Sequence, residues 1–497
     1  MFIKHALAST LAFVSPRVKI EVSSLHVHVL SPTRDQTRHV FFMSSSEEIS
    51  SCAKIKDEEG NANDFLEDLC ASFGAGPEGL LSLQTSNGER GVFLNKDIQE
   101  NDIILQIPLD SCIRDDKPPN WYAEAQAQYK ADDDDNPHHY NPSEWAVRLA
   151  ASLIDLQINY GEDDISLSAK EKWFSMMPDP EYLRASLPIH WPADILEKAR
   201  CTALEIANDA TYFTRVEAVS DLSAAFQFSE EAQKKPEENN LDLQTLCSNS
   251  WDLVQTRSCR VERIDGVQLC PPLRVLAPIF DFINHGSSQY NGEGSSNAYF
   301  GLEGNDEEGD ILALTVRARR NINAKEEVLI DYGDSARPAW RCLASYGFVP
   351  EYRVTGPDDE QSGGADESVA ELFYNGKRYE VSSNTIPTEL VEAAYATYLE
   401  EEVGASAFER VGDPEDELAS SLPPDVALRI AKRISDAAFD LLIDHPEVTE
   451  DEHDDDKSGV DAEAVAKKLA SSLRLSQHQV LLACAVGLRD YAVRETP

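Results

Sequence analysis

Two stretches with the residue pattern of β-strands lie far apart in the chain, with a long helical pattern between them. The first covers residues 64–115 and includes residues 90–94 and Asp102–Pro108, a run rich in β-branched residues that Pro108 terminates. The second covers residues 273–332 and includes Val328-Leu329-Ile330. The sequence therefore predicts an α+β fold in which a helical insert interrupts a β-rich domain.

The predicted helical insert covers about residues 116–250. Apolar residues in its first half recur at spacings of three and four, which places them on one face of a helix: Trp145, Leu149, Leu153 and Leu156. Several prolines follow, and residues 196–212 resume a helical pattern. With the flanking strands, the insert gives a β-rich domain that we place at residues 64–350.

The C-terminal part is predicted to be a separate, mostly helical domain at residues 370–497, after an acidic linker at residues 355–368. Pro423-Pro424 opens one helix, and Ser476 is expected to cap a last helix that runs through Val493. The first of these helices has a regular apolar face: Val426, Ile430, Ile434, Ala438 and Leu441.

Residues 1–46 differ in composition from the rest, because they hold five basic and two acidic side chains and no acid before Glu21. This composition is typical of an organellar presequence, and fits a secretory signal less well. A disordered tail, or a start site upstream of the true one at Met43, would also explain it. We expect these residues to lie outside the fold. A presequence would favour a plastid or another organelle, and its absence the cytoplasm or nucleus.

The charge of the chain limits its partners. The 497 residues carry 44 basic and 89 acidic side chains, a formal net charge of −45. Nucleic-acid binding needs concentrated Lys and Arg, so we expect no nucleic-acid partner. No run of 18 apolar residues occurs, and we expect no membrane partner either. Basic protein substrates would be attracted by such a field.

The nine cysteines are scattered, with no C-x-C or C-x-x-C pair, which indicates reduced thiols in an intracellular protein. Structural zinc needs closely paired ligands, so we expect no metal site.

Three ordered motifs carry the chemistry: Asp281-Phe282-Ile283-Asn284-His285, then Tyr332-Gly333, then Tyr346-Gly347-Phe348-Val349. Together they resemble the SET-domain protein methyltransferases, in the subgroup of the Rubisco large-subunit methyltransferase and the actin-histidine methyltransferase. The stretches 88–93 and 171–174 resemble the opening strand and helical insert of that family. The resemblance implies a β-rich SET fold over residues 64–350 and a substrate-binding domain at 370–497.

The resemblance also implies roles for single residues. Tyr332 is the expected catalytic residue, and Asp281 is expected to contact substrate or to cap a turn. The cofactor would be S-adenosylmethionine, held by Gly88, Glu89, Arg90, Arg257, Asn284, His285 and Phe348. Arg suits the α-carboxylate of this cofactor because the guanidinium pairs with it in a planar, bidentate way. An amide such as that of Asn284 can both accept and donate hydrogen bonds.

Methyl transfer requires the reacting atoms to be close and collinear, so positioning by the protein supplies much of the acceleration. A lysine must first lose its proton, which costs about 4–5 kcal/mol at pH 7 from an ordinary pKa near 10.4. A desolvated channel beside a sulfonium cation offsets part of that cost. No strong general base is therefore required.

The sequence departs from the family at two points. Residues 334–340 lack an Asn that many members carry after the Tyr-Gly pair, and no cysteine cluster follows. The second departure disfavours a histone substrate. We therefore predict a monomeric protein-lysine methyltransferase that acts on a non-histone protein. Protein-histidine N-methylation, which needs less deprotonation near pH 7, and a non-catalytic binding module remain open alternatives.

Overall fold

The computed structural model describes residues 59–86, 89–132, 144–159, 165–227, 242–266, 269, 271–286, 295–305, 311–332, 338–350, 369–382, 386–398, 422–443 and 461–495. Contacts between residues divide the chain into residues 1–61 and residues 62–497. The predicted presequence and the acidic linker at 355–368 lie outside the described residues. Across the described ranges, every helix is too short or too polar to span a membrane.

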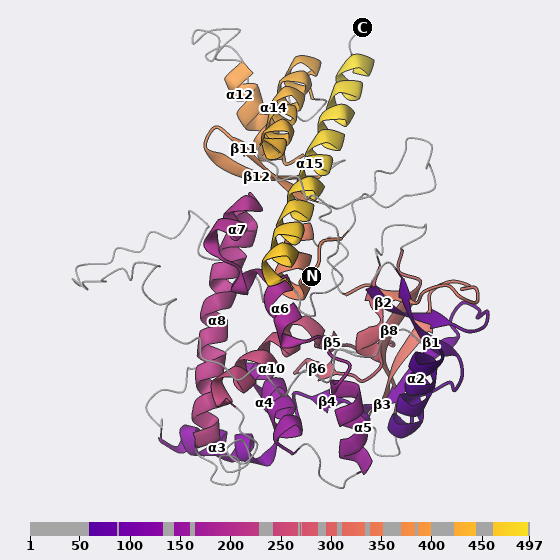
Figure 1. Cartoon of the computed structure of the whole chain (residues 1–497). Helices are drawn as coiled ribbons and strands as arrows, with labels where there is room; N and C mark the ends of the chain where they lie inside the picture. Colours follow the sequence, from indigo (N-terminus) through magenta and orange to yellow (C-terminus); the bar gives the residue numbers. More distant parts are fainter. Residues whose placement is uncertain are drawn as a thin grey trace. The chain divides into compact units, whose positions relative to one another are not determined.

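The central element is a five-stranded sheet in the order β3-β9-β8-β10-β7 (Figure 1). Its strands are β3 (Ile103–Pro108), β9 (Ile311–Ala318), β8 (Ala298–Asn305), β10 (Leu329–Ile330) and β7 (Asn284–His285). The first three pair antiparallel, whereas β10 pairs parallel to both β8 and β7. The sheet thus joins strands from both sides of the insert, as the sequence predicts.

Two smaller sheets flank the central one. A hairpin joins β1 (Leu81–Ser86) to β2 (Glu89–Leu94), and a three-stranded sheet has the order β4-β6-β5. The latter comprises β4 (Ile113–Arg114), β6 (Leu273–Leu276) and β5 (Cys259–Val261). The N–H of Val328 donates to the carbonyl of Val92 at 2.8 Å, so β2 is tied to the segment that leads into β10.

The helical insert is confirmed and contains most of the helices before the C-terminal part. They are α3 (Asn120–Asp132), α4 (Glu144–Ile158), α5 (Ile165–Phe174), α6 (Pro180–Ser186), η3 (Pro188–His190), α7 (Ala193–Lys198), α8 (Thr202–Gln227) and α10 (Leu243–Arg257). The predicted apolar face lies on α4, where Leu149, Leu153 and Leu156 are buried. The main hydrophobic core joins this face to the strands of the central sheet.

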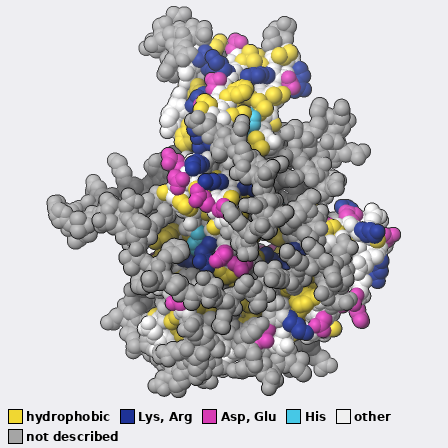
Figure 2. Space-filling model, in the orientation of Figure 1, with side chains coloured by type: hydrophobic (Ala, Val, Ile, Leu, Met, Phe, Trp, Pro, Cys, Tyr) yellow, Lys and Arg dark blue, Asp and Glu magenta, His cyan; other side chains and the backbone are white. Residues whose placement is uncertain are grey.

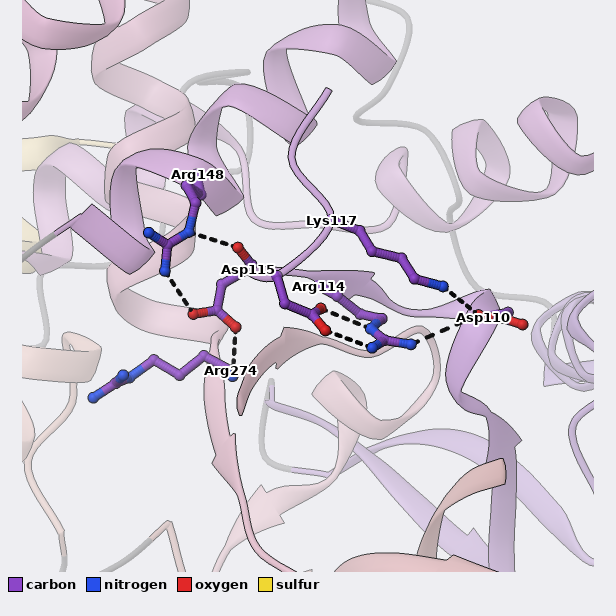
Figure 3. A network of polar contacts seen from close by, with 7 residues as sticks. Asp110, Arg114, Asp115, Lys117, Arg148 and Arg274 are labelled. Atoms are coloured by element: carbon purple, nitrogen blue, oxygen red, sulfur yellow. Dashed lines mark hydrogen bonds and ion pairs between the residues drawn. The ribbon is translucent and has the colours of Figure 1, made fainter. Parts of the chain in front are cut away.

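A buried aspartate fastens the insert to the small three-stranded sheet (Figure 3). Asp115 follows β4, and its carboxylate accepts from the backbone N–H of Arg274 on β6 at 2.9 Å. The other carboxylate oxygen accepts from Arg148 on α4 at 3.2 Å. Arg148 also donates to the Asp115 carbonyl at 2.6 Å. Since both carboxylate oxygens are bonded, this link holds α4 against the strands.

The C-terminal part is helical, as predicted, but it starts with a hairpin that the sequence analysis missed. It contains β11 (Val369–Tyr374), β12 (Lys377–Ser382), α12 (Thr388–Tyr398), α14 (Pro424–Leu442) and α15 (Ala462–Glu495). These elements share a hydrophobic core of their own. Figure 2 shows hydrophobic side chains at the surface of this region, among Lys and Arg side chains.

Side chains from the C-terminal part also contact the insert. The carboxylate of Glu371 on β11 accepts from the N–H groups of Thr202 and Ala203, both at 2.8 Å, at the start of α8. A negative charge at a helix N-terminus is favourable because it satisfies unpaired N–H donors. Apolar residues of α7 and α15 meet in a small third core.

Two predictions about secondary structure are wrong. Residues 64–73 were assigned to a stretch with strand signals, but they belong to helix α2 (Glu59–Phe73). Ser476 does not begin the last helix, because α15 starts at Ala462 and runs through Ser476 without a break. Its actual cap is Asp461, which accepts from the N–H groups of Glu463 and Ala464, each at 3.1 Å. Short helices make up the remaining elements: η2 (Leu109–Ser111), η4 (Phe280–Phe282) and α11 (Ala339–Tyr346).

Candidate functional site

Parallel pairing of β7 with β10 brings two of the sequence motifs together. Asn284 lies opposite Leu329, and His285 opposite Ile330, so Tyr332 follows two residues after the paired strand. The N–H of Tyr332 donates to Nδ1 of His285 at 3.3 Å, and the two rings lie 5.2 Å apart. Residues that are 47 positions apart in sequence are thereby placed in direct contact.

The hydroxyl group of Tyr332 is held in place by a backbone carbonyl. It donates to the carbonyl oxygen of Ile283 at 2.8 Å. Burial raises the pKa of Tyr332 well above its usual value, although the nearby charge of Arg257 acts in the opposite direction. Tyr332 therefore keeps its proton at physiological pH.

Aromatic rings from the third motif complete this part of the site. Tyr346, at the end of α11, donates its hydroxyl to the carbonyl of Tyr332 at 3.3 Å, and its ring lies 5.1 Å from the Tyr332 ring. Phe348 lies 5.9 Å from the ring of His285 and 6.4 Å from that of Tyr332. Gly347 between them has a positive φ of 77°, which favours glycine. The three motifs therefore form one aromatic cluster.

The side chain of Asn284 contacts β2 and the segment before β10. Its Nδ2 donates to the carbonyl of Arg90 at 2.9 Å and to Oε1 of Glu327 at 2.8 Å. Gly91 makes this close approach possible, because a Cβ at that position would stand 2.1 Å from Oε1 of Glu327.

Asp281 is buried next to this cluster. Oδ1 accepts from the indole N–H of Trp173 on α5 at 3.1 Å. Oδ2 is 3.9 Å from the guanidinium of Arg257, and among the described residues it has no hydrogen-bond partner. Burial raises the pKa of Asp281 despite the opposing effects of Arg257 and Trp173. The side chain of Asp281 is fully buried, and its predicted contact with a substrate stays a prediction.

Two arginines lie beside Asp281 and close to each other. Arg257, in the last turn of α10, donates to the carbonyl of Asp281 at 2.6 Å. Arg90, on β2, donates to the carbonyl of Met176 at 2.9 Å and stacks over the ring of Phe282 at 4.6 Å. Burial lowers the pKa of Arg90, and the like charge of Arg257 lowers it further. Two positive charges therefore lie next to the buried carboxyl group of Asp281.

The structure thus brings together most of the predicted site residues: Arg90, Arg257, Asp281, Asn284, His285, Tyr332 and Phe348. Gly88 lies outside the described residues. Glu89 belongs to β2, but the position of its side chain is likewise outside the description. None of the described His, Cys, Asp and Glu side chains form a group that could hold a metal ion.

Sequence reasoning missed two residues of the site. Trp173 lies in the insert, 108 positions from Asp281, and only the fold brings the two together. Glu327 stands in Lys325-Glu326-Glu327, which has the composition of an exposed turn. For Glu327 we find no sequence signal short of the three-dimensional structure.

Several solved structures are similar to this chain. One is the SET domain of LSMT bound to lysine and AdoHcy, with 15% identity, a TM-score of 0.45, and coverage of 88% of this chain and 92% of that chain. Another is Rubisco LSMT bound to sinefungin and monomethyllysine, with 16% identity, a TM-score of 0.45, and coverage of 87% and 92%. A third is Rubisco LSMT bound to AdoMet, with 16% identity, a TM-score of 0.42, and the same coverage.

Comparison with curated proteins gives no match. The family model of the SET domain, however, matches residues 89–333. This range begins at β2 and ends just after Tyr332, so it includes both paired strands of the site. The chain therefore contains a SET domain, which spans residues 89–333.

Proposed function

We propose that this protein is an S-adenosylmethionine-dependent protein methyltransferase that methylates a lysine of a non-histone protein. The SET domain supports this proposal. The similar structures are of proteins bound to AdoMet, AdoHcy, lysine or methylated lysine.

One observation carries the proposal: the parallel pairing of β7 with β10. It places the amide of Asn284, the ring of His285 and the hydroxyl of Tyr332 in one cluster, beside Phe348. S-adenosylmethionine supplies an electrophilic methyl group on a sulfonium when it is bound. A displacement at that carbon requires reactants that are held close together and collinear. Aromatic rings that pack against one another are suited to hold them in this way.

The residues present fit this cofactor. Asn284 offers an amide oxygen that could accept from the α-ammonium group. Arg257 is about one quarter exposed and donates one hydrogen bond to the Asp281 carbonyl, so that further N–H groups could bind the α-carboxylate. Phe348 would flank the cofactor or the target channel. The backbone of His285, and Gly88, Glu89 and Arg90 near β2, remain predicted cofactor contacts.

Tyr332 is the proposed catalytic residue, with a role in positioning the transferred methyl group. Its hydroxyl donates to the carbonyl of Ile283 at 2.8 Å, and this hydrogen bond holds its oxygen in one place. The proton of the attacking lysine would then leave to solvent before transfer. Asp281, predicted to contact substrate, would instead hold Arg257 in place, because its backbone carbonyl accepts a hydrogen bond from the guanidinium of Arg257.

For substrate binding we propose residues 370–497, which have a separate hydrophobic core and contact the insert. The lack of a cysteine cluster after the SET domain supports a non-histone target. An organellar location rests on the composition of residues 1–46 and remains a proposal.

The test is incubation of the full chain with methyl-labelled S-adenosylmethionine and a cell lysate. We expect labelled protein with the wild type, and at least a hundredfold less with Tyr332→Phe and Asn284→Ala. Binding of S-adenosylhomocysteine by Tyr332→Phe is the control for folding. Full labelling by either variant would contradict the assigned roles.

Histidine N-methylation is the alternative reaction with the same cofactor. Mass spectrometry of the labelled peptide distinguishes the two, since it shows which side chain carries the methyl group. A non-catalytic binding module would instead show no binding of S-adenosylhomocysteine in calorimetry.

A further inference from the structure

We infer that Glu327 is a positioning residue, which orients the amide of Asn284 so that this side chain presents only its oxygen to the α-ammonium group of the cofactor. The inference deepens the proposed function and rests on it. It assigns a role to a residue outside the three motifs, and it narrows the role of Asn284 from donor and acceptor to acceptor alone.

The argument starts from the two hydrogen bonds of Asn284. A primary amide has two N–H donors on nitrogen and one acceptor oxygen. Here Nδ2 donates to the Arg90 carbonyl at 2.9 Å and to Oε1 of Glu327 at 2.8 Å. Both partners can only accept. A flipped amide would point its oxygen at two other oxygens, so the network fixes the orientation.

Glu327 itself is held in place by its backbone. Asn297 donates to the carbonyl of Glu327 at 2.7 Å and accepts from the N–H of Leu329 at 2.8 Å. The flanking Val328 donates to Val92 at 2.8 Å. The carboxylate of Glu327 therefore extends from a backbone segment that is held in place by hydrogen bonds. An acceptor in a fixed position orients the amide of Asn284 more strongly than a mobile acceptor would.

Gly91 adds an independent observation. A Cβ at this position would lie 2.1 Å from Oε1 of Glu327 and 3.1 Å from Nδ2 of Asn284. Any larger residue on this part of β2 would displace the carboxylate from the amide. Gly91 on β2 thus leaves the space that the hydrogen bond between Glu327 and Asn284 occupies. A carboxylate at the surface, pointing into solvent, would not need this space.

The chemical consequence is selectivity for a cation. With both N–H groups engaged, Oδ1 is the polar atom of Asn284 that remains for a ligand, and the adjacent carboxylate adds negative potential. The α-ammonium group of S-adenosylmethionine matches such a site, whereas its α-carboxylate does not. The carboxylate would go to Arg257, so the two ends of the amino-acid group are bound by different residues.

The experiment measures binding of S-adenosylhomocysteine to the full chain by calorimetry. We expect Glu327→Ala to weaken binding about tenfold, as loss of a hydrogen bond to a charged group does. Glu327→Gln keeps an acceptor oxygen and should stay within threefold of the wild type. The matched control is Glu463→Gln on α15, since Glu463 is exposed and pairs with Lys467, and this variant should change binding less than twofold.

A double-variant cycle separates positioning from general support. If Glu327 acts through Asn284, adding Glu327→Ala to Asn284→Ala should weaken binding by less than a further twofold. Binding of 5′-deoxy-5′-methylthioadenosine, which lacks the amino-acid group, should be the same in wild type and Glu327→Ala.

Three results would overturn the inference: wild-type affinity in Glu327→Ala, multiplied effects in the double variant, or equal weakening for methylthioadenosine. In each of these the wild type binds S-adenosylhomocysteine, so the proposed function stands. A wild type that binds no S-adenosylhomocysteine would overturn the proposed function, and this inference with it.

Discussion

Two buried aspartates, one in the helical insert and one at the proposed site, differ in how completely their carboxylate oxygens are hydrogen-bonded. Asp252, in the insert, accepts from Arg215 with both oxygens, at 2.8 and 3.2 Å, and from His190 at 3.0 Å. Asp281, at the site, has one oxygen bonded to Trp173, while the other has no hydrogen-bond partner in the described part of the chain. Both oxygens of Asp252 thus accept hydrogen bonds, whereas only one oxygen of Asp281 does.

The pKa values of the two carboxyls respond in opposite directions. Burial acts to raise the pKa of Asp252, but the hydrogen bonds from His190 and Arg215 outweigh it and lower the pKa below its usual value. Burial also acts on Asp281, and there the more distant Arg257 does not outweigh it, so the pKa is raised. Strongly perturbed groups of the second kind are common at functional sites.

A single helix links the two regions. Asp252 and Arg257 both lie on α10, about 1.4 turns apart. Asp252 anchors the helix to α8 and η3, and Arg257 in its last turn reaches the site. The comparison indicates that the well-paired Asp252 fixes the scaffold, while the less well-paired Asp281 lies beside Arg257, which reaches the site.

The largest change in the free energy of unfolding is expected when the well-paired charge of Asp252 is removed. Asp252→Asn replaces one acceptor oxygen by an NH₂ group, which must face a donor of Arg215 or His190. Breaking a buried, hydrogen-bonded ion pair in this way should lower the free energy of unfolding by about 3 kcal/mol. Urea unfolding followed by circular dichroism measures this change.

The matched control for this variant is Asp194→Asn. Asp194 pairs with Lys198 at 3.3 Å, but its side chain is 69% exposed. Exposed pairs contribute about 0–1 kcal/mol, so this variant should unfold almost like the wild type. Equal stability of Asp252→Asn and Asp194→Asn would show that the pairing of Asp252 does not anchor α10.

The pH dependence of stability should separate the two aspartates by sign. The lowered pKa of Asp252 gives stability that is present above its unfolded pKa, near 4, and is lost as pH falls further. The raised pKa of Asp281 has the opposite effect, because the folded state binds a proton more readily and gains stability as pH falls toward 4. Each slope is limited to about 1.4 kcal/mol per pH unit.

Urea unfolding of wild type, Asp252→Asn and Asp281→Asn between pH 7 and pH 3 tests these signs. The stability advantage of the wild type over Asp252→Asn should shrink as pH falls. Relative to Asp281→Asn, the wild type should gain stability over the upper part of this range. Slopes of the same sign in both comparisons would contradict the opposite pKa shifts.

Much of the fold was predictable from local patterns. The insert follows from apolar spacing on α4, and α14 begins at Pro424, one residue after its cap at Pro423. The hairpin of β11 and β12 was missed, although Asn375-Gly376 at its turn is a typical hairpin signal. The start of α15 was misplaced because Ser476 has the residue type of a cap but lies within the helix, where it is buried.

Only those residues of the site that belong to a recognisable sequence motif were predictable from the sequence. Asn284, His285 and Tyr332 follow from ordered family motifs, and the pairing of β7 with β10 confirms that they meet. Glu327 and Trp173 could not be found, because each acts on a residue far away in sequence. Long-range polar pairs depend on how elements pack, and a one-dimensional pattern does not encode them.

Of the two aspartates, Asp281 at the site is expected to change the free energy of unfolding less when it is replaced by Asn. In Asp281→Asn, the amide oxygen can still accept from Trp173, and the backbone carbonyl still accepts from Arg257. The NH₂ group would replace an oxygen that has no hydrogen-bond partner among the described residues. The lost attraction to Arg257 at 3.9 Å is offset by relief from burying a charge, so stability should stay within about 1 kcal/mol of the wild type.

Asp281→Ala is the informative comparison for this variant, because it removes the acceptor of Trp173 and leaves the buried indole N–H without a partner. It should therefore be less stable than Asp281→Asn by about 1–3 kcal/mol. If Asp281→Asn instead destabilised the protein as much as Asp252→Asn does, the Asp281 carboxylate would be a structural anchor like Asp252. The contrast between scaffold and site would then lose its physical basis.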